Sequence, residues 1–247
     1  MRNIPTDRRL IVALDVPNPA SARTLVKQIG GDVGFYKVGL ELVMAGGLDL
    51  VRGLRDDGFD VFLDMKLLDI GNTVMRAVAR AAETGATFLT IHGIDAKTAE
   101  AAVAGRADRS LRLLGVTVLT SLDADDLAEQ GIAEPIDDLV VRRAGLCVGA
   151  GVDGVVASPN EAARVRATVG AAPLIVTPGI RRADNDAGDQ TRIATPTAAL
   201  NSGADYLVVG RPITQAGDPQ AAARAFQTEI ARAVEQNDQA RPSDSAK

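Results

Sequence analysis

A short unit recurs along the chain and constrains its fold more than any other feature of the sequence. Each copy has a glycine, a small residue, a polar residue and then a run rich in leucine and β-branched residues. Clear copies begin at Gly85, Gly151 and Gly203, and a looser copy begins at Gly58. Glycine just past a helix end is the favoured cap, and the apolar run after it is typical of a buried strand. The unit therefore predicts helices that end immediately before strands.

Further apolar runs complete a series of eight expected strands, each followed by helical material. The strands are expected at residues 9–15, 34–39, 61–70, 84–92, 111–119, 150–157, 173–176 and 202–209. The helices are expected at residues 20–29, 46–57, 73–83, 96–104, 135–149, 160–168, 196–201 and 219–235. Such alternation requires a parallel sheet, and eight units in about 230 residues favour a closed barrel over an open doubly wound sheet. The first strand is not followed by Gly-x-Gly-x-x-Gly, which weakens the dinucleotide-binding alternative.

The expected fold is therefore an α/β single-domain (β/α)8 TIM barrel spanning residues 9–235, because no linker-like stretch interrupts that range. Residues 1–8 are expected to form an N-terminal arm, and the polar residues 236–247 a disordered tail. Hydrophobic residues make up 46% of the chain and aromatic residues 3%. The core is thus expected to consist of Val, Leu, Ile and Ala, the usual filling of parallel sheets.

Charge and composition argue against several classes of protein. The net charge is −5 and no Lys/Arg block is present, which argues against nucleic-acid binding but leaves a small anionic substrate possible. The single cysteine, Cys147, excludes an internal disulfide, suits a reducing cytoplasm and is expected to be buried. The single histidine, His92, leaves no histidine cluster for a metal. No signal core and no apolar run of about 18 residues is present, so we expect a soluble cytoplasmic protein.

Charged and polar residues stand where the expected strands end. In (β/α)8 barrels the carboxyl ends of the strands carry the chemistry. The residues expected at this rim are Asp15, Lys37, Asp64, Lys66, Asp69, His92, Thr120, Ser121, Arg181 and Arg211. One Asp–Lys pair at a strand end is explained as readily by a structural ion pair as by a site. Two acids and two lysines on the first three strands favour a functional site.

The later part of the rim suggests a phosphate site. A polar loop at residues 182–191 exceeds the usual two to six residues of such connections, which is typical of a lid, with a mobile insertion as the alternative. Gly210 and Arg211 follow the eighth strand, where barrels of this kind often bind phosphate. Glycine lets a backbone N–H approach an oxyanion and arginine offers a two-pronged donor. We expect a phosphorylated substrate whose reacting end lies near Lys66.

Seven motifs occur in order along residues 9–235. They are Leu14-Asp15-Val16, Tyr36-Lys37-Val38-Gly39, Asp64-x-Lys66-x-x-Asp69-Ile70-x-x-Thr73, Leu119-Thr120-Ser121, Thr177-Pro178-Gly179-Ile180-Arg181, Gly188-Asp189-Gln190 and Gly210-Arg211-Pro212. Together they resemble the motifs of the bacterial-type orotidine 5′-phosphate decarboxylase family. The Asp-x-Lys-x-x-Asp motif alone is shared with sugar-phosphate decarboxylases and aldolases of the same superfamily. Where the family often has Phe-His and Pro, this chain has Leu67-Leu68 and Gly71, which removes no charged group.

The resemblance implies a reaction. Orotidine 5′-monophosphate would lose CO2 to give UMP, the last step of de novo pyrimidine synthesis, without a cofactor or a metal. The implied catalytic residues are Lys66, Asp64, Asp69 and Lys37. Lys66 would stabilise the carbanion at C6 and then protonate it. Asp64, beside the substrate carboxylate, would hold Lys66 charged and aimed.

The resemblance also assigns binding roles. Lys37 and Asp15 would bind ribose hydroxyls, and Thr120 with Ser121 would contact the pyrimidine edge. Phosphate would be held by Gln190, Gly210 and Arg211, with Arg181 at the base of the lid. Asp69, together with Ile70 and Thr73, would reach into the neighbouring subunit's site, which implies an obligate homodimer with shared active sites. His92 is interpreted as a structural rim residue, with a substrate contact as the alternative.

Two other functions are compatible with parts of this pattern. A metal-dependent decarboxylase or aldolase acting on a keto-sugar phosphate would use Asp64 and its neighbours to bind Mg²⁺. The long loop containing Gln190 and the Thr120-Ser121 pair argue against it. A non-catalytic sensor of a phosphorylated ligand would have no need for Lys66 between two acids. The sequence therefore favours the decarboxylase.

Overall fold

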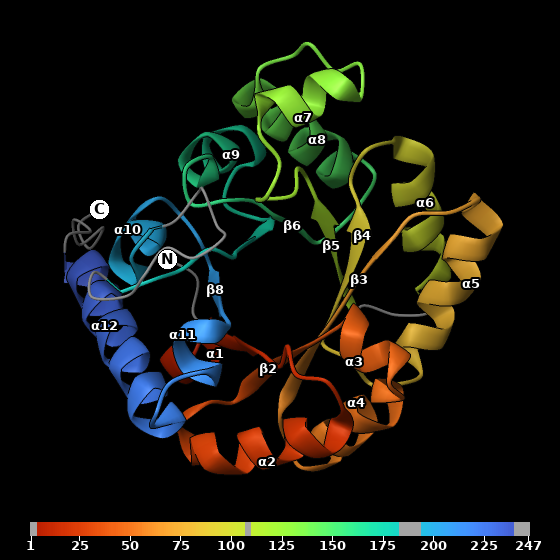
Figure 1. Ribbon diagram of the computed structural model, residues 1–247. Coiled ribbons are helices and arrows are strands. Elements are labelled where there is room, and N and C mark those ends of the chain that lie inside the picture. The colour runs from red at the N-terminus through yellow and green to blue at the C-terminus, as the bar shows by residue number, and fades with distance from the viewer. Residues whose placement is uncertain (1–3, 107–109, 183–193, 240–247) are drawn as a thin grey trace, which may run out of the picture.

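Eight parallel strands close on themselves in sequence order, with β1 paired to both β2 and β8 (Figure 1). The computed structural model describes residues 4–106, 110–182 and 194–239. The strands are β1 (Leu10–Ala13), β2 (Phe35–Gly39), β3 (Asp60–Leu67), β4 (Phe88–His92), β5 (Arg112–Val116), β6 (Gly154–Val156), β7 (Leu174–Thr177) and β8 (Tyr206–Val209). Closure leaves no unpaired strand edge. The expected α/β barrel is confirmed.

Helices lie around the barrel, and most of them form an outer ring (Figure 1). They are α1 (Thr6–Arg9), α2 (Pro19–Ile29), α3 (Leu40–Met44), α4 (Gly47–Asp56), α5 (Gly71–Ala82), α6 (Ala96–Gly105), α7 (Ala124–Glu129), α8 (Ile136–Gly149), α9 (Ala162–Val169), α10 (Pro196–Asn201), α11 (Arg211–Thr214) and α12 (Pro219–Gln239). Within the ranges described, no helix combines the length and apolar character needed to cross a bilayer.

The core has two layers because side chains of a strand alternate between its two faces. Outward-facing residues pack against the helices and are mostly aliphatic, as expected. The barrel interior differs from that expectation, because four of the chain's seven Phe and Tyr rings gather there. These rings are Phe35, Phe62, Phe88 and Tyr206, with centroids 5.1 Å apart for the Phe35–Phe88 and Phe88–Tyr206 pairs. Large rings fill the barrel and form the floor of the space above them.

The two ends of the chain differ from the sequence-based boundaries. Residues 6–9, expected to belong mostly to an arm, form α1, and the Arg9 guanidinium donates to the carbonyl of Asp205 at 3.0 Å. Helix α12 continues four residues beyond its expected end at residue 235, as far as Gln239. The Asn237 side chain donates to Asn201 Oδ1 at 2.9 Å, which ties this last turn to α10. The remainder of the expected tail, residues 240–247, lies outside the described ranges.

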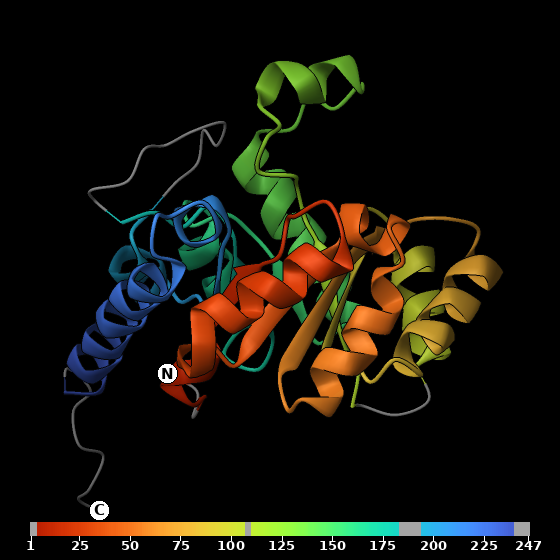
Figure 2. The same ribbon diagram turned by 60° about the horizontal axis from the view of Figure 1, so that its bottom comes forward.

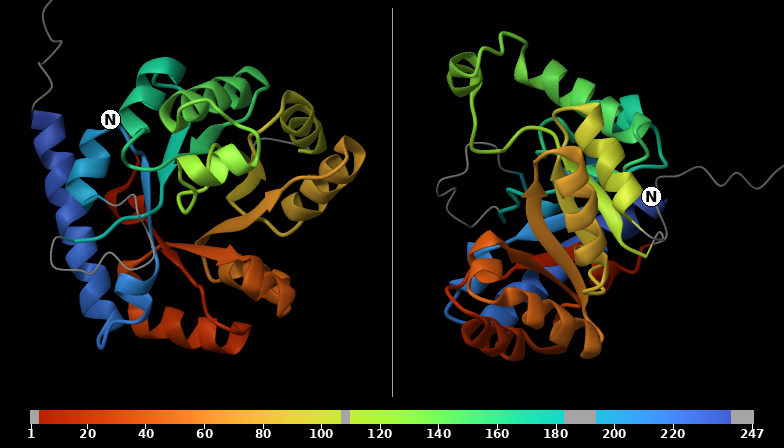
Figure 3. Two further views of the ribbon diagram at one scale, coloured as in Figure 1. Left: turned by 45° about the horizontal axis from the view of Figure 1, so that its top comes forward. Right: turned by 90° about the vertical axis from the view of Figure 1, so that its right-hand side faces the viewer.

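Several local features were not predicted. Helix α5 begins at Gly71, two residues before its expected start at residue 73, with Ile70 at its N-cap and no side-chain cap. Helices α3, α7 and α11 were not expected at all. In α7, Asp123 and Asp126 form a reciprocal capping box, which stabilises a short acidic helix that apolar periodicity does not reveal. The side views show α7 standing beyond the barrel on the side of the strands' carboxyl ends (Figures 2 and 3).

Cys147 is fully buried and occupies space that two glycines leave free. A methyl group added at Gly93 or Gly115 would collide with the Cys147 sulfur. Burial raises the pKa of this thiol to about 12, so it stays protonated at neutral pH. The residue therefore packs between α8 and the β4–β5 pair, in line with the packing role expected from the sequence.

This packing predicts a coupled pair of substitutions. Gly115→Ala should lower the free energy of unfolding by about 1–3 kcal/mol, because it overfills a closed space. Cys147→Ala removes the sulfur, so the double variant should lose less stability than the two single variants added together. Chemical denaturation of all four proteins measures this coupling. Strict additivity would show that the sulfur and the glycine do not share the space.

Candidate active site

A cavity of about 480 Å³ opens at the carboxyl ends of the strands, above the aromatic floor. Its polar lining consists of Asp15, Lys37, Asp64, Lys66, Thr120, Arg181, Arg211 and Gln215. Its apolar lining includes Phe62 of the floor together with Ala13, Val116, Val118, Leu119, Val156 and Val208. The size of the cavity and its mixture of apolar and polar lining residues suit a small ligand with charged groups.

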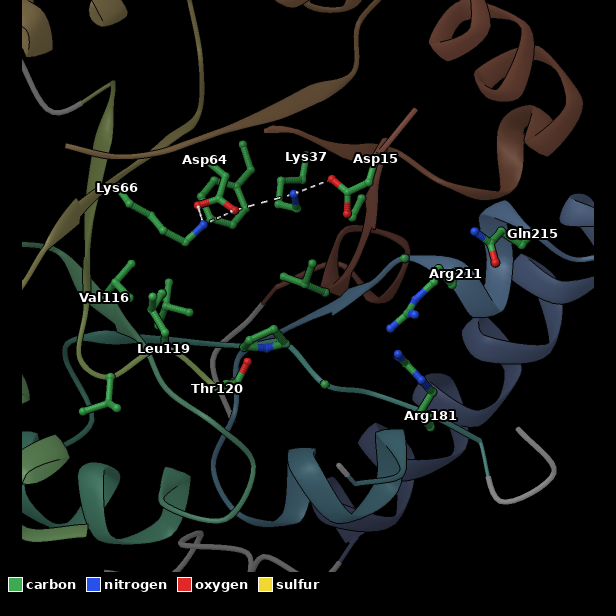
Figure 4. Close-up of a pocket in the computed structure, with 18 residues that line it drawn as sticks. Asp15, Lys37, Asp64, Lys66, Val116, Leu119, Thr120, Arg181, Arg211 and Gln215 are labelled. Atoms are coloured by element: carbon green, nitrogen blue, oxygen red, sulfur yellow. Dashed lines mark hydrogen bonds and ion pairs between the residues drawn. The ribbon is translucent and has the colours of Figure 1, made fainter. Parts of the chain in front are cut away.

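Four charged side chains form a continuous row along one wall (Figure 4). Asp15 Oδ1 lies 2.9 Å from Lys37 Nζ, and Lys37 Nζ lies 3.5 Å from Asp64 Oδ2. Lys66 Nζ donates to both oxygens of Asp64 at 2.8 Å. The alternating charges that the sequence placed on the first three strands are thus brought together in one row.

Burial and charge oppose each other in the middle of this row. Lys37 and Asp64 are 8% and 9% exposed, and burial alone disfavours their charged forms. For Asp64, the nearby ammonium groups of Lys37 and Lys66 outweigh burial, so the pKa of its carboxyl lies below its usual value. For Lys37, the carboxylates of Asp64 and Asp15 outweigh burial and raise its pKa. Both groups are therefore charged at neutral pH.

A glycine next to Lys37 makes room for the row. Lys37 lies on β2, and a Cβ placed at Gly39 would lie 3.1 Å from Lys37 Nζ and 3.5 Å from Asp15 Oδ1. A side chain at this position would press on the Lys37–Asp15 ion pair. Steric crowding therefore explains why the Tyr36-Lys37-Val38-Gly39 motif ends in glycine.

The backbone of Lys66 is unusual. Lys66 has φ +50°, the sole positive φ of a non-glycine residue among the residues described. This conformation costs about 1–2 kcal/mol. The Thr90 hydroxyl accepts a hydrogen bond from the Lys66 N–H at 3.0 Å and donates to Asp64 Oδ1 at 2.8 Å. Sequence reasoning missed Thr90, although a lone hydroxyl inside the apolar run Phe88–Ile91 was a signal.

Two arginines face the charged row across the cavity (Figure 4). Arg181 follows β7 and is 6% exposed, and Arg211 begins α11 after β8. Gly210 lines the same end of the cavity, as does Gln215, which sequence reasoning did not identify. Guanidinium groups gathered at one end of a cavity suit a phosphate or carboxylate group.

Not every predicted site residue lines the cavity. Asp69 and Thr73 are exposed beyond β3, and Asp69 Oδ1 accepts from the backbone N–H of Ile70 at 2.6 Å. Ser121 is exposed as well, whereas its neighbour Thr120 lines the cavity. Gln190 and most of the expected lid lie outside the described residues. The roles expected for these four residues therefore stay predictions.

His92 is half-buried at the end of β4 and is not among the cavity-lining residues. Burial, followed by the positive charges of Lys66 and Arg143, holds its pKa below the usual value, although Asp64 acts in the opposite direction. This position agrees with its interpretation as a residue of the rim.

The described residues contain no group of three or more His, Cys, Asp or Glu side chains placed to hold a metal ion.

Comparison with known proteins decides the family. A family model described as "Orotidine 5′-phosphate decarboxylase / HUMPS family" matches residues 8–226. The chain belongs to this family. The orotidine 5′-phosphate decarboxylase of Rhodopseudomonas palustris (strain BisB5) is 53% identical over 231 residues, which are 93% of this chain and 98% of that protein. The orotidine 5′-phosphate decarboxylase of Methylorubrum populi is 52% identical over 226 residues, covering 92% of this chain and 96% of that protein.

A solved structure shares the family's fold with this chain. The crystal structure of orotidine 5′-phosphate decarboxylase from Lactobacillus acidophilus superposes with a TM-score of 0.80 at 37% sequence identity. The match covers 90% of this chain and 99% of that one. The resemblance recognised from the seven motifs is thereby confirmed.

The single histidine allows a direct test of the site's electrostatics. We expect the NMR titration of His92 to give a pKa below about 6.5, and Lys66→Ala to raise it, because a nearby positive charge is removed. Since the folded pKa lies below the unfolded one, the free energy of unfolding should fall as pH drops from about 6.5 through the folded pKa. Lys27→Ala, which removes an exposed lysine on α2, is the matched control. An unchanged His92 titration in Lys66→Ala would contradict the proximity of the two charges.

Proposed function

We propose that this chain is an orotidine 5′-phosphate decarboxylase, which converts orotidine 5′-monophosphate to UMP and CO2 in de novo pyrimidine synthesis without a cofactor. One observation carries the proposal. The Lys66 ammonium, paired to a buried carboxylate, lies at one end of a cavity whose other end presents Arg181 and Arg211. The membership of the family and the relatives named above support this substrate. A single buried free cysteine supports a cytoplasmic location.

The chemical step needs a positive charge beside C6 of the pyrimidine and a proton that can be transferred to that carbon. The bond between C6 and the carboxylate breaks, CO2 leaves, and the electron pair remains on C6. An ammonium at C6 stabilises that charge as it develops and then transfers its proton to C6. Lys66 supplies the ammonium, becomes a neutral amine and regains a proton from water. Asp64 accepts hydrogen bonds from the Lys66 ammonium and so holds it in place until the transfer.

The other residues of the site bind the rest of the nucleotide. Lys37 and Asp15 bind the ribose hydroxyls, and Thr120, with Ser121, contacts the pyrimidine edge. Arg211 and Gly210, joined by Gln190, hold the phosphate, with Arg181 beside them. The phosphate lies far from C6, but the energy released when it binds helps to lower the activation barrier of the chemical step at C6. Lys37, Asp15 and Thr120 lie between Lys66 and the arginines, which supports a nucleotide bound with its reacting carbon at Lys66 and its phosphate at the arginines (Figure 4).

The metal-dependent alternative is electrostatically unfavourable at this site. It requires Asp64 as an Mg²⁺ ligand, yet both oxygens of Asp64 already accept from the Lys66 ammonium. The Lys37 ammonium lies 3.5 Å from the same carboxylate. A divalent cation at Asp64 would be repelled by both ammonium groups.

The reaction and the role of Lys66 are tested together. Wild-type protein should decarboxylate orotidine 5′-monophosphate as fast with EDTA as without it, measured as the decrease of the orotate absorbance. Lys66→Ala should lower kcat by at least about 10³-fold, because it removes both the charge and the proton donor. It should retain the fold and measurable binding of UMP. Lys27→Ala, an exposed lysine remote from the cavity, should behave as wild type.

Other outcomes identify the alternatives. Activity that disappears with EDTA indicates a metal-dependent enzyme of the superfamily. Absence of turnover by the wild type, with tight binding of UMP, indicates a sensor. Near-wild-type turnover by Lys66→Ala would refute the proposed mechanism.

We further propose a homodimer in which Asp69, with Thr73, completes the partner's site. The large hydrophobic residues that remain exposed in the described chain lie together on one part of the rim, after β2, β3 and β4. They are Leu40, Met44, Leu48, Leu68, Ile70 and Ile94. Ile70, 78% exposed, is adjacent to Asp69. Exposed apolar residues that follow three adjacent strands are typical of a protein interface.

Mixing two inactive variants tests the shared site. Lys66→Ala and Asp69→Ala chains, refolded together, form mixed dimers with one intact site if Asp69 acts in the partner's cavity. Random pairing should then restore about a quarter of the wild-type activity, since half of the dimers are mixed and each has one working site of two. Each variant refolded alone provides the baseline. No recovery in a verified mixed dimer would show that both residues serve one chain's site.

A further inference from the structure

The pairing between β3 and β4 is interrupted beside Lys66. Phe62 pairs with Phe88 and Leu63 with Leu89, but the next pair is Leu67 with Ile91. Strand β3 thus advances four residues, from Leu63 to Leu67, while β4 advances two. The additional length on β3 is a bulge, and bulges redirect side chains next to functional sites. Asp64 and Lys66 lie within it.

Thr90 is the residue of β4 that faces this bulge. It lies between Leu89 and Ile91, and it is 0% exposed. Its hydroxyl accepts from the Lys66 N–H at 3.0 Å and donates to Asp64 Oδ1 at 2.8 Å. One hydroxyl therefore replaces the ladder contacts that the bulge removes. Because Thr90 is not among the cavity-lining residues, its influence on a bound substrate passes through these two neighbours.

We infer that Thr90 is a positioning residue that holds the Lys66 ammonium at the reacting carbon by securing the bulged backbone of Lys66 and the carboxylate of Asp64 together. The inference rests on the role proposed for Lys66. A backbone at φ +50° persists where surrounding contacts hold it. Without the hydroxyl, the Lys66 N–H loses the acceptor described above and Asp64 loses a donor, which favours relaxation of the bulge. Such relaxation moves the Lys66 side chain.

The hydroxyl also affects the charge of the row. The ionisable groups around Asp64 come from four strand ends and are Asp15, Lys37, Lys66 and His92. Burial raises the pKa of Asp64, whereas Lys37, Lys66 and the hydrogen bond from Thr90 lower it. Loss of the hydroxyl therefore shifts the Asp64 pKa upward. The rate is expected to fall at low pH as Asp64 becomes protonated, and this fall is the acid limb of the plot of rate against pH. In a variant without the hydroxyl, the acid limb should move to higher pH.

A series of substitutions at Thr90 tests the inference. Thr90→Val keeps the shape but removes both hydrogen bonds, and we expect kcat to fall about 10- to 100-fold, since small displacements of a reacting group have effects of this size. The dissociation constant for UMP should change by less than about threefold, because Thr90 does not line the cavity. Thr90→Ser should restore most of kcat and the acid limb, because it keeps the hydroxyl.

Thr84→Val is the matched control. Thr84 is 4% exposed at the opposite end of the barrel, and its hydroxyl also makes two hydrogen bonds, but it donates to the backbone carbonyl of Ala81 and accepts from the N–H of Ala86. The Thr84→Val variant should have a lower melting temperature than the wild type but the same kcat and the same acid limb. If Thr90→Val does not fold, Thr90→Cys replaces it, with a weaker donor and a kcat expected between those of the serine variant and Lys66→Ala.

Three results would overturn the inference. The first is a wild-type kcat and acid limb in Thr90→Val, or in Thr90→Cys where that variant is used. The second is a Thr90→Ser variant as slow as the valine or cysteine variant. The third is a Thr84→Val variant that loses as much kcat as the Thr90 variant. Lys66→Ala measured in parallel separates the two proposals. If Lys66→Ala is inactive and Thr90→Val behaves as wild type, only the role of Thr90 is refuted. If Lys66→Ala turns over at a near-wild-type rate, the role proposed for Lys66 fails and the inference about Thr90 fails with it, whereas absence of turnover by the wild type refutes the proposed function.

Discussion

The site depends on one buried carboxylate shared by two ammonium groups. Asp64 is 9% exposed, with Lys66 Nζ at 2.8 Å and Lys37 Nζ at 3.5 Å. Removing any member of this group leaves an uncompensated charge at a site where desolvation is costly. Asp15 extends the row and balances the second ammonium. The row therefore places two lysine side chains beside one buried carboxylate in a cavity lined by both polar and apolar residues.

The barrel makes this arrangement possible by bringing neighbouring strand ends to one rim. β1, β2 and β3 are adjacent, so Lys37 forms ion pairs with Asp15, 22 positions before it, and with Asp64, 27 positions after it. The aromatic rings below them close the barrel and exclude water from beneath the row. The bulge in β3 then turns Asp64 and Lys66 into the same cavity. Stability of the scaffold and placement of the charges are thus properties of the same strands.

Several parts of the site were predictable because local chemistry specifies them. Asp15, Lys37, Asp64 and Lys66 follow apolar runs, and strand ends of a parallel barrel meet. Thr90 was not predictable as a site residue, because its importance arises from a register shift between two strands. Gln215 lies on the turn after α11, whose position depends on packing around β8. Helix α7 was missed since its capping by aspartates leaves no apolar period to read.

The sequence by itself determined the strand–helix alternation, the barrel and the family, because hydrophobic periodicity, glycine caps and motif order are local properties of the chain. The tertiary structure alone decided which charges touch, how deeply Asp64 is buried, and how the backbone of Lys66 departs from a regular strand. These quantities depend on contacts between residues distant in the chain. Electrostatic interactions change steeply with distance and burial, so only the folded geometry sets them.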